Sequence, residues 1–252
     1  MQQPQRDLPW LQKALQSAIE LELSTLPPYL CGYWALKDNQ SYPAIQIFSI
    51  VKQEMLHFGL ACNMLTATGK QPEILTGYGR IFYPGPLPGG VVPKCDPKLI
   101  PCDGPLVVEL GFPNFKAFAL MCMRIEFPES PVPKPALAAA EEFPSIGEFY
   151  DAVLDAFQQN DAKIPYTKTN QQKPALGLFI VDNLTNAKAA IQLIQQQGEG
   201  GDRNPFSGGT TLSHFYAFES STTARDMFSM PLPKRGTGPA IPFRFWMPMS
   251  TT

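Results

Sequence analysis

Glu54 and His57 lie three residues apart, a spacing that places both side chains on one face of an α-helix, where they can ligate one cation together. The flanking sequence predicts this helix over residues 42–68, because apolar residues recur there in steps of three and four. They are Ile47, Ile50, Ala61 and Met64. Glu54 and His57 fall on the same inward stripe, where a carboxylate needs a partner. The pair is therefore a candidate metal site.

Two other predicted helices each carry a carboxylate on the inward stripe. The stripe of residues 8–26 steps onto Glu22 after Leu11, Leu15 and Ala18. The stripe of residues 114–126 steps onto Glu126 after Phe115, Ala119 and Cys122. Glu20 lies about 200° from Glu22 around its helix, so we expect Glu20 to face solvent and to take no part in the site.

A Glu-x-x-His pair alone often arises by chance and is commonly a surface pair, but three acids on matching stripes favour a metal site. The alternative is a buried network of ion pairs and hydrogen bonds. Inward cationic partners are scarce, with only Arg124 close by in the sequence, and a cation is the natural neutraliser of several buried carboxylates. We therefore expect a divalent metal, first of all iron, with manganese and zinc as alternatives.

His214 and Glu199 are undecided by residue pattern alone. His214 is one of only two histidines, and it begins a short aromatic segment, where a histidine is more often a core or helix-start residue than a ligand. Glu199 lies between two glycines at the end of a predicted helix, where a turn can aim a side chain sharply.

The 27 prolines are clustered, and the stretches between the clusters predict an all-α helical bundle. Helices are expected over residues 8–26, bent or interrupted at Pro27 and Pro28 and continuing to about residue 36, then 42–68, 114–126, from the capping box at Ser145, 176–197 and 212–228. Residues 70–113 predict a long proline- and glycine-rich crossover with one short strand at 106–110. Residues 229–252 predict a non-helical tail that packs over the bundle.

Composition limits the class of protein. The 252 residues, 44% of them hydrophobic, fit one domain spanning residues 1–252. The net charge of −2, with no basic run among aromatic residues, argues against a nucleic-acid partner. A polar N-terminus and the lack of an apolar run of about 18 residues predict a soluble, cytoplasmic protein without a membrane partner. The five cysteines are expected to be reduced thiols, and a zinc site at Cys95 and Cys102 is disfavoured without a CxxC pair.

Five segments together resemble the ferritin-like domain found in iminophenyl-pyruvate dimer synthases. They are residues 18–30 (AIELELSTLPPYL), 54–57 (EMLH), 145–150 (SIGEFY), 197–200 (QGEG) and 214–219 (HFYAFE). The resemblance spans residues 8–220 and implies a ferritin-like helical bundle with a non-haem metal site. The matching positions are Glu22, Glu54, His57, Glu126, Glu199 and His214. The later helices contain no second Glu-x-x-His motif, so one ion and two ions are equally compatible with the pattern.

Two functions fit these features. The first is an oxygen-dependent oxidase that uses iron or manganese to act on a small aromatic compound. The walls of its pocket would come from Tyr29, Phe58, Phe118, Phe215 and Tyr216. The alternative is a non-catalytic protein that holds the metal with a small, coloured aromatic ligand. Iron storage is a poorer match, because a shell-forming bundle lacks such a proline-rich connection. The pattern also permits a homo-oligomer.

Overall fold

The computed structural model describes residues 5–74, 81–128, 142–172, 177–198 and 212–223. Within these ranges the chain forms six α-helices and one short 3₁₀ turn, with no strand. The all-α prediction is therefore confirmed. No helix among the described residues is long and apolar enough to cross a membrane.

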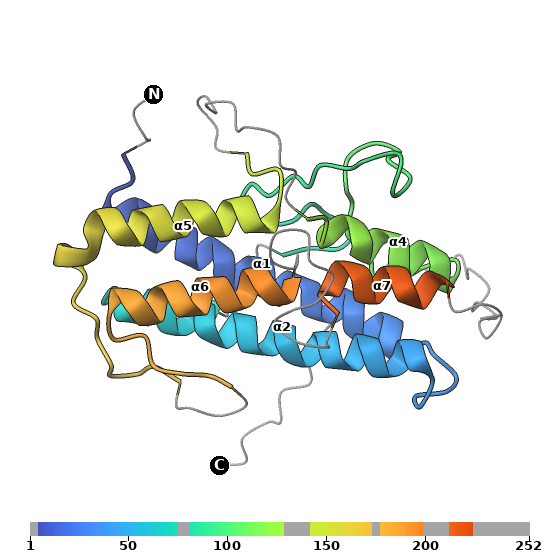
Figure 1. Ribbon diagram of the computed structural model, residues 1–252, viewed down its shortest axis with the longest axis horizontal. Coiled ribbons are helices and arrows are strands. Elements are labelled where there is room, and N and C mark those ends of the chain that lie inside the picture. The colour runs from blue at the N-terminus through green and yellow to red at the C-terminus, as the bar shows by residue number, and fades with distance from the viewer. Residues whose placement is uncertain (1–4, 75–80, 129–141, 173–176, 199–211, 224–252) are drawn as a thin grey trace, which may run out of the picture.

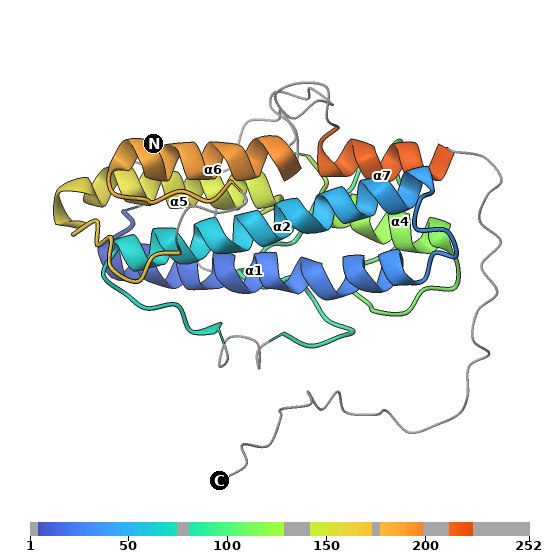
Figure 2. The ribbon, with the colours of Figure 1, turned by 90° about the horizontal axis from the view of Figure 1, so that it is seen from below.

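The helices form a bundle of four rods, two of which are built from a pair of shorter helices (Figures 1 and 2). Helices α1 (Leu8–Trp34) and α2 (Tyr42–Ala67) are the two continuous rods. The third rod has α5 (Ile146–Asn160) in line with α4 (Phe115–Ile125), and the fourth has α6 (Leu184–Gly198) in line with α7 (His214–Thr223). In each composite rod, the break between its two helices lies near the middle of the bundle, so helix ends face the interior there.

Helix α1 runs through Pro27 and Pro28 as a single helix, so of the two predicted alternatives, a bend or an interruption, the interruption is excluded. Proline has no N–H to donate to the carbonyl four residues earlier, which leaves the carbonyl of Ser24 without its partner from Pro28. The hydroxyl of Tyr83 donates a 2.6 Å hydrogen bond to this carbonyl. The connection that follows α2 thus supplies the hydrogen bond that the proline removes.

The boundaries of the other early helices agree closely with the prediction. Helix α2 ends at Ala67, with Thr68 as its C-cap residue. Gly69 follows with a φ of 85°, which glycine adopts without strain. The Asn114 side chain caps α4 by accepting from the N–H of Ala117 at 2.9 Å. The Ser145 hydroxyl caps α5 by accepting from the N–H of Glu148 at 3.0 Å, as the capping box predicts.

Helix α6 begins at Leu184, eight residues later than the predicted start at 176. The backbone before Leu184 finds side-chain partners in place of helical ones: the Gln171 amide bonds both the N–H and the carbonyl of Val181, at 2.8 Å each. The Asn183 side chain then accepts from the N–H of Asn186 at 2.9 Å and so caps the helix. Helix α7 ends at Thr223, and the predicted residues 224–228 lie outside the described residues, as does the tail 229–252.

The crossover after α2 corrects two further predictions. The expected strand at 106–110 is an isolated bridge, in which Gly85 and Val108 exchange hydrogen bonds of 3.1 and 2.7 Å. Cys95 and Cys102 form a disulfide and are not reduced thiols. A turn in which the N–H groups of Leu99 and Ile100 bond the carbonyl of Asp96 brings the two cysteines together, with 5.7 Å between their Cα atoms. Cys31, Cys62 and Cys122 are free, as predicted.

Candidate metal centre

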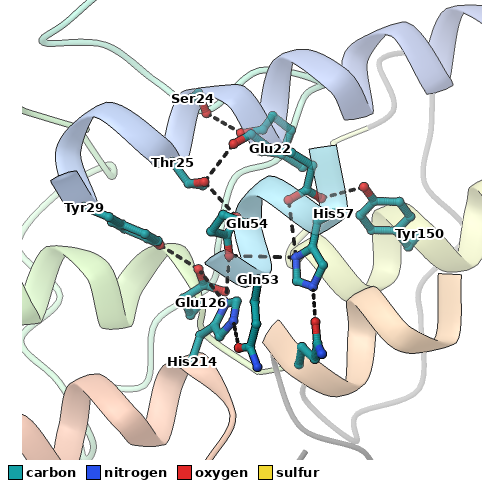
Figure 3. A network of polar contacts seen from close by, with 12 residues as sticks. Glu22, Ser24, Thr25, Tyr29, Gln53, Glu54, His57, Glu126, Tyr150 and His214 are labelled. Atoms are coloured by element: carbon teal, nitrogen blue, oxygen red, sulfur yellow. Dashed lines mark hydrogen bonds and ion pairs between the residues drawn. The ribbon is translucent and has the colours of Figure 1, made fainter. Parts of the chain in front are cut away.

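Five of the six predicted ligands converge in the middle of the bundle, where the composite rods change helix (Figure 3). Glu22 comes from α1, and Glu54 and His57 come from α2. Glu126 directly follows α4 as its C-cap residue, and His214 is the first residue of α7. All five are buried. The sixth, Glu199, lies outside the described residues.

The ligands form two groups that share Glu54. Glu22, Glu54 and His57 make one group, here called the first half, and Glu54, Glu126 and His214 make the other, the second half. In each group one donor atom per residue lies within 4.8 Å of the others. Such groups of buried carboxylate and imidazole donors could each hold a metal ion.

In the first half, the Nδ1 atom of His57 faces two carboxylates. It lies 3.6 Å from Oε2 of Glu22 and 3.9 Å from Oε1 of Glu54. In the second half, Nδ1 of His214 lies 2.8 Å from Oε1 of Glu54 and 3.5 Å from Oε1 of Glu126. The short contact to Glu54 is not aligned as a hydrogen bond, and this buried nitrogen has no hydrogen-bond partner. A buried ring nitrogen that faces carboxylates without an aligned hydrogen bond is suited to bind a metal ion.

The carboxylate of Glu54 lies between the two imidazole rings, which stack with their centroids 5.6 Å apart. Its Oε1 atom faces Nδ1 of both histidines, while Oε2 accepts a 2.7 Å hydrogen bond from the Thr25 hydroxyl. The two ligand groups therefore meet at this one carboxylate.

A buried tyrosine supports the outer carboxylate of each half (Figure 3). The Tyr150 hydroxyl donates to Oε1 of Glu22 at 2.5 Å, and the Tyr29 hydroxyl donates to Oε1 of Glu126 at 2.6 Å. Tyr29 was expected in a pocket wall, and Tyr150 was not predicted at all. The signal for Tyr150 was available, because it lies three residues before Val153 on the inward stripe of α5.

Glutamines contact the outer ring nitrogens of both histidines, and sequence analysis missed both of these side chains. Oε1 of Gln197 lies 2.8 Å from Nε2 of His57, and Oε1 of Gln53 lies 2.8 Å from Nε2 of His214. Gln197 precedes the last residue of α6, and Gln53 directly precedes Glu54 in α2. No periodic pattern marks a glutamine that reaches across helices.

Glu20 is buried at 8% exposure, so its predicted solvent-facing position is wrong. It accepts a 3.2 Å hydrogen bond from the Gln16 amide, which also bonds the carbonyl of Glu73 in the connection. The connection after α2 thus covers the side of α1 that was expected to face solvent. Glu20 belongs to neither ligand group.

Comparison with known proteins identifies the family. A family model described as ferritin-like matches residues 15–222, most of the chain. The chain belongs to the ferritin-like family. A crystal structure of a ferritin-like protein from Caulobacter vibrioides is 26% identical, with a TM-score of 0.62 over 86% of this chain and 73% of the other. No curated protein gives a significant match. These findings confirm the ferritin-like helical bundle that the five sequence segments imply.

The pKa values of the two histidines in this ferritin-like site weaken the argument that a metal is needed because inward cationic residues are scarce. Burial alone would lower the pKa of His214, but the charge and contacts of Glu126 and Glu54 outweigh it and raise that pKa to about 10. The pKa of His57 is likewise raised, against its burial, by Glu22 and Glu54. Imidazolium rings can therefore pair the carboxylates without a metal. Burial raises the pKa of Glu22 to about 7, whereas His214 and His57 outweigh burial and lower the pKa of Glu54 to about 2, so Glu22 is the harder of these two to keep ionised.

The residues nevertheless fit a metal, and three observations support the fit. The donor set of carboxylates with imidazole suits iron, manganese and zinc. Both Nδ1 atoms point inward while both Nε2 atoms contact an outer partner, the usual arrangement for ligating histidines. Burial and the nearby carboxylates keep the pKa values of Tyr29 and Tyr150 well above the ordinary range, so their hydroxyls stay protonated and hold one oxygen of each outer carboxylate.

A small cavity, partly open to solvent and with room for about one water molecule, adjoins the site. It is lined by Glu22, Glu54, His57, Glu126, Ile146, Gly147, Ile194, Gln195 and Gly198. Its apolar wall is thus aliphatic, from the first turn of α5 and the end of α6. The predicted aromatic residues do not line it. Phe118 packs in the core against Phe112 and Phe218, Phe215 packs against Phe127, and Phe58 and Tyr216 are half-buried.

Proposed function

We propose that the protein binds two divalent metal ions, normally iron, one in each half of the centre, with Glu54 as the bridging ligand. The observation that carries this proposal is the pair of ligand groups that share Glu54. Each group offers one imidazole and two carboxylates, so three protein ligands per ion leave coordination positions for other molecules. Manganese or zinc would fit the same donors.

We further propose that the centre serves an oxygen-dependent oxidase that acts on a small aromatic compound. When bound, the metal pair would supply the electrons for reaction with O₂, a chemistry that the side chains of the site lack. The side chains would position the ligands: the hydroxyls of Tyr29 and Tyr150 hold the outer carboxylates, and Thr25 holds Glu54. The aliphatic side chains of Ile146 and Ile194, which line the small cavity beside the ligands, would be the first apolar contacts of the substrate. The five segments that resemble iminophenyl-pyruvate dimer synthases support this reaction class.

Elemental analysis tests the metal proposal. We expect about two equivalents of transition metal per chain after expression with iron, manganese and zinc supplied. Less than about a tenth of an equivalent would refute the proposal, because structural and catalytic sites of this donor set bind tightly. The imidazolium–carboxylate network would then be the resting state of the site.

Oxygen consumption separates the oxidase from the alternative, a non-catalytic protein that holds the metal and a coloured aromatic ligand. The charge pairing among Glu54, His57 and His214 favours that alternative, because a paired site is stable without turnover. For the oxidase, iron-loaded protein should consume O₂ when small aromatic amines or phenols are added, and the Glu54→Gln variant should not. A stoichiometric visible chromophore without O₂ uptake would establish the binding role instead.

A further inference from the structure

Each imidazole of the centre has its second ring nitrogen against the side-chain oxygen of a glutamine. The contacts are 2.8 Å for both His57 with Gln197 and His214 with Gln53, and in both cases the atoms are Nε2 and Oε1. The partners are 140 and 161 residues apart in the sequence and come from different helices. The same histidine–glutamine contact is thus made twice, by glutamines from two different helices. Local packing around one histidine does not explain this repetition.

An amide oxygen only accepts hydrogen bonds, so Nε2 must be the donor in each contact. The hydrogen of the ring is therefore held on the outer nitrogen, and Nδ1 faces the carboxylates of Glu22, Glu54 and Glu126. Nδ1 is thus the ring nitrogen available to a metal ion.

We propose that Gln53 and Gln197 are positioning residues that fix both histidines with Nδ1 directed among the carboxylates. This inference rests on the proposed metal site and names two residues that orient its imidazole ligands. The glutamine contacts thus set which ring nitrogen faces the position of a metal ion.

The choice of glutamine over an acid has a physical reason. Ligating histidines commonly donate to a carboxylate, a backbone carbonyl or water, and a carboxylate there makes the ring a stronger donor. Three buried carboxylates already face these two rings. Two more acids would leave five buried carboxyl groups beside only two imidazole rings. A neutral amide orients the ring without adding charge, and it favours the divalent over the trivalent state of a bound metal.

Zinc affinity tests the positioning role, with Gln12 as a control. Gln12 is a half-buried glutamine of α1 whose amide donates to the carbonyl of Thr68 at 3.2 Å, away from both ligand groups. Gln197→Met and Gln53→Met should each weaken the binding of one zinc ion by about 10–100-fold. Gln12→Met should leave zinc binding unchanged. Gln197→Glu and Gln53→Glu keep an acceptor and should retain zinc affinity, and in iron-loaded protein they should lower the reduction potential.

Ring ¹⁵N NMR reports the same contact without any metal, and the chain has only two histidines to assign. Metal-free wild type should show a slowly exchanging Nε2–H on both rings. Each Met variant should lose that signal from one ring and keep it on the other, and each Glu variant should restore it. Wild-type zinc affinity together with an unchanged Nε2–H signal in both Met variants would overturn the inference. If wild type bound no zinc, the proposed metal function would fail, and the ring signals alone would decide the role of the glutamines.

Discussion

Glu22 and His57 lie well inside helices of 27 and 26 residues, whereas Glu126 and His214 lie at the ends of helices of 11 and 10 residues. In the first half, the ligands are therefore held by helical hydrogen bonds on both sides. In the second half, the two ligands other than the shared Glu54 have such bonds on one side only, and helix ends open more easily than helix centres. The two halves offer matching donors on backbones of different stiffness.

The aromatic neighbours of the second-half ligands compensate for this difference. Phe127 directly follows Glu126, and Phe215 directly follows His214, and the two rings pack edge to face with centroids 5.7 Å apart. Both rings are buried. The end of α4 and the start of α7 are thus fastened to each other by the residues adjacent to the ligands. A binding site built from helix ends needs this additional packing, and one built from helix centres does not.

Substitution of the shared ligand should have the largest effect, because it removes a donor from both halves. Glu54→Gln keeps the shape of the side chain but replaces a bridging carboxylate with a neutral amide. We expect metal content to fall from about two equivalents to below about 0.2, measured by elemental analysis, with helical content unchanged by circular dichroism. Retention of one full equivalent would show that Glu54 does not bridge the two halves.

Substitution of an outer ligand of the first half should remove one ion. Glu22→Gln should leave about one equivalent of metal, held by the second half. The matched control is Glu20→Gln, because Glu20 is also buried on α1 but belongs to neither ligand group. The control should keep both equivalents. Equal loss from the two variants would mean that burial on α1, and not ligation by Glu22, controls metal content.

His214→Ala tests the second half in the same way. The variant should retain the ion of the first half and lose the other, together with any part of the visible absorption that depends on a coupled pair of ions. Stability should fall by about 1–3 kcal/mol in urea unfolding of the metal-free protein, because a buried, paired side chain is removed. Two full equivalents in this variant would restrict the metal centre to Glu22, Glu54, His57 and Glu126.

The difference between the halves also explains which residues the sequence could identify. Glu22, Glu54 and His57 lie in long periodic helices, where phase alone directs each side chain inward. Glu126 follows from the same phase, although it proves to be a cap residue. His214 starts a helix after a segment without periodicity, so residue pattern left it undecided, and only the family resemblance singled it out.

The errors arose where partners distant in sequence decide the outcome. The phase of α1 directs Glu20 away from the bundle, and nothing local shows that the later connection covers it. The same connection supplies the Tyr83 hydroxyl that allows α1 to pass through Pro27 and Pro28. Gln53 and Gln197 were missed for the same reason, because their partners are 161 and 140 residues away. Hydrophobic periodicity shows which face of one helix points to the core. It does not show side-chain contacts between segments that are distant in the sequence.

A smaller change should loosen the second half without touching a ligand. Phe127→Leu removes part of the ring that packs on Phe215, and we expect a stability loss of about 1 kcal/mol. The affinity of the second ion should fall by up to about tenfold, measured by zinc titration, while that of the first ion should not change. An equal fall for both ions would show that the halves do not differ in stiffness, and that the packing supports the centre as a whole.

Removal of the two tyrosine hydroxyls should lower stability equally in the two halves. Tyr150 and Tyr29 each donate one short hydrogen bond to a buried carboxylate, so Tyr150→Phe and Tyr29→Phe should each cost about 1.5–3 kcal/mol in the metal-free protein. Tyr166→Phe is the matched control, because its hydroxyl donates to Asp161 at 2.6 Å at an exposed position, where the loss should be below about 1 kcal/mol. Urea unfolding measures all three. If Tyr29→Phe proved much more costly than Tyr150→Phe, the second half would depend on its hydroxyl as well as on its ring packing. The asymmetry would then extend from the backbone to the hydrogen bonds around the ligands.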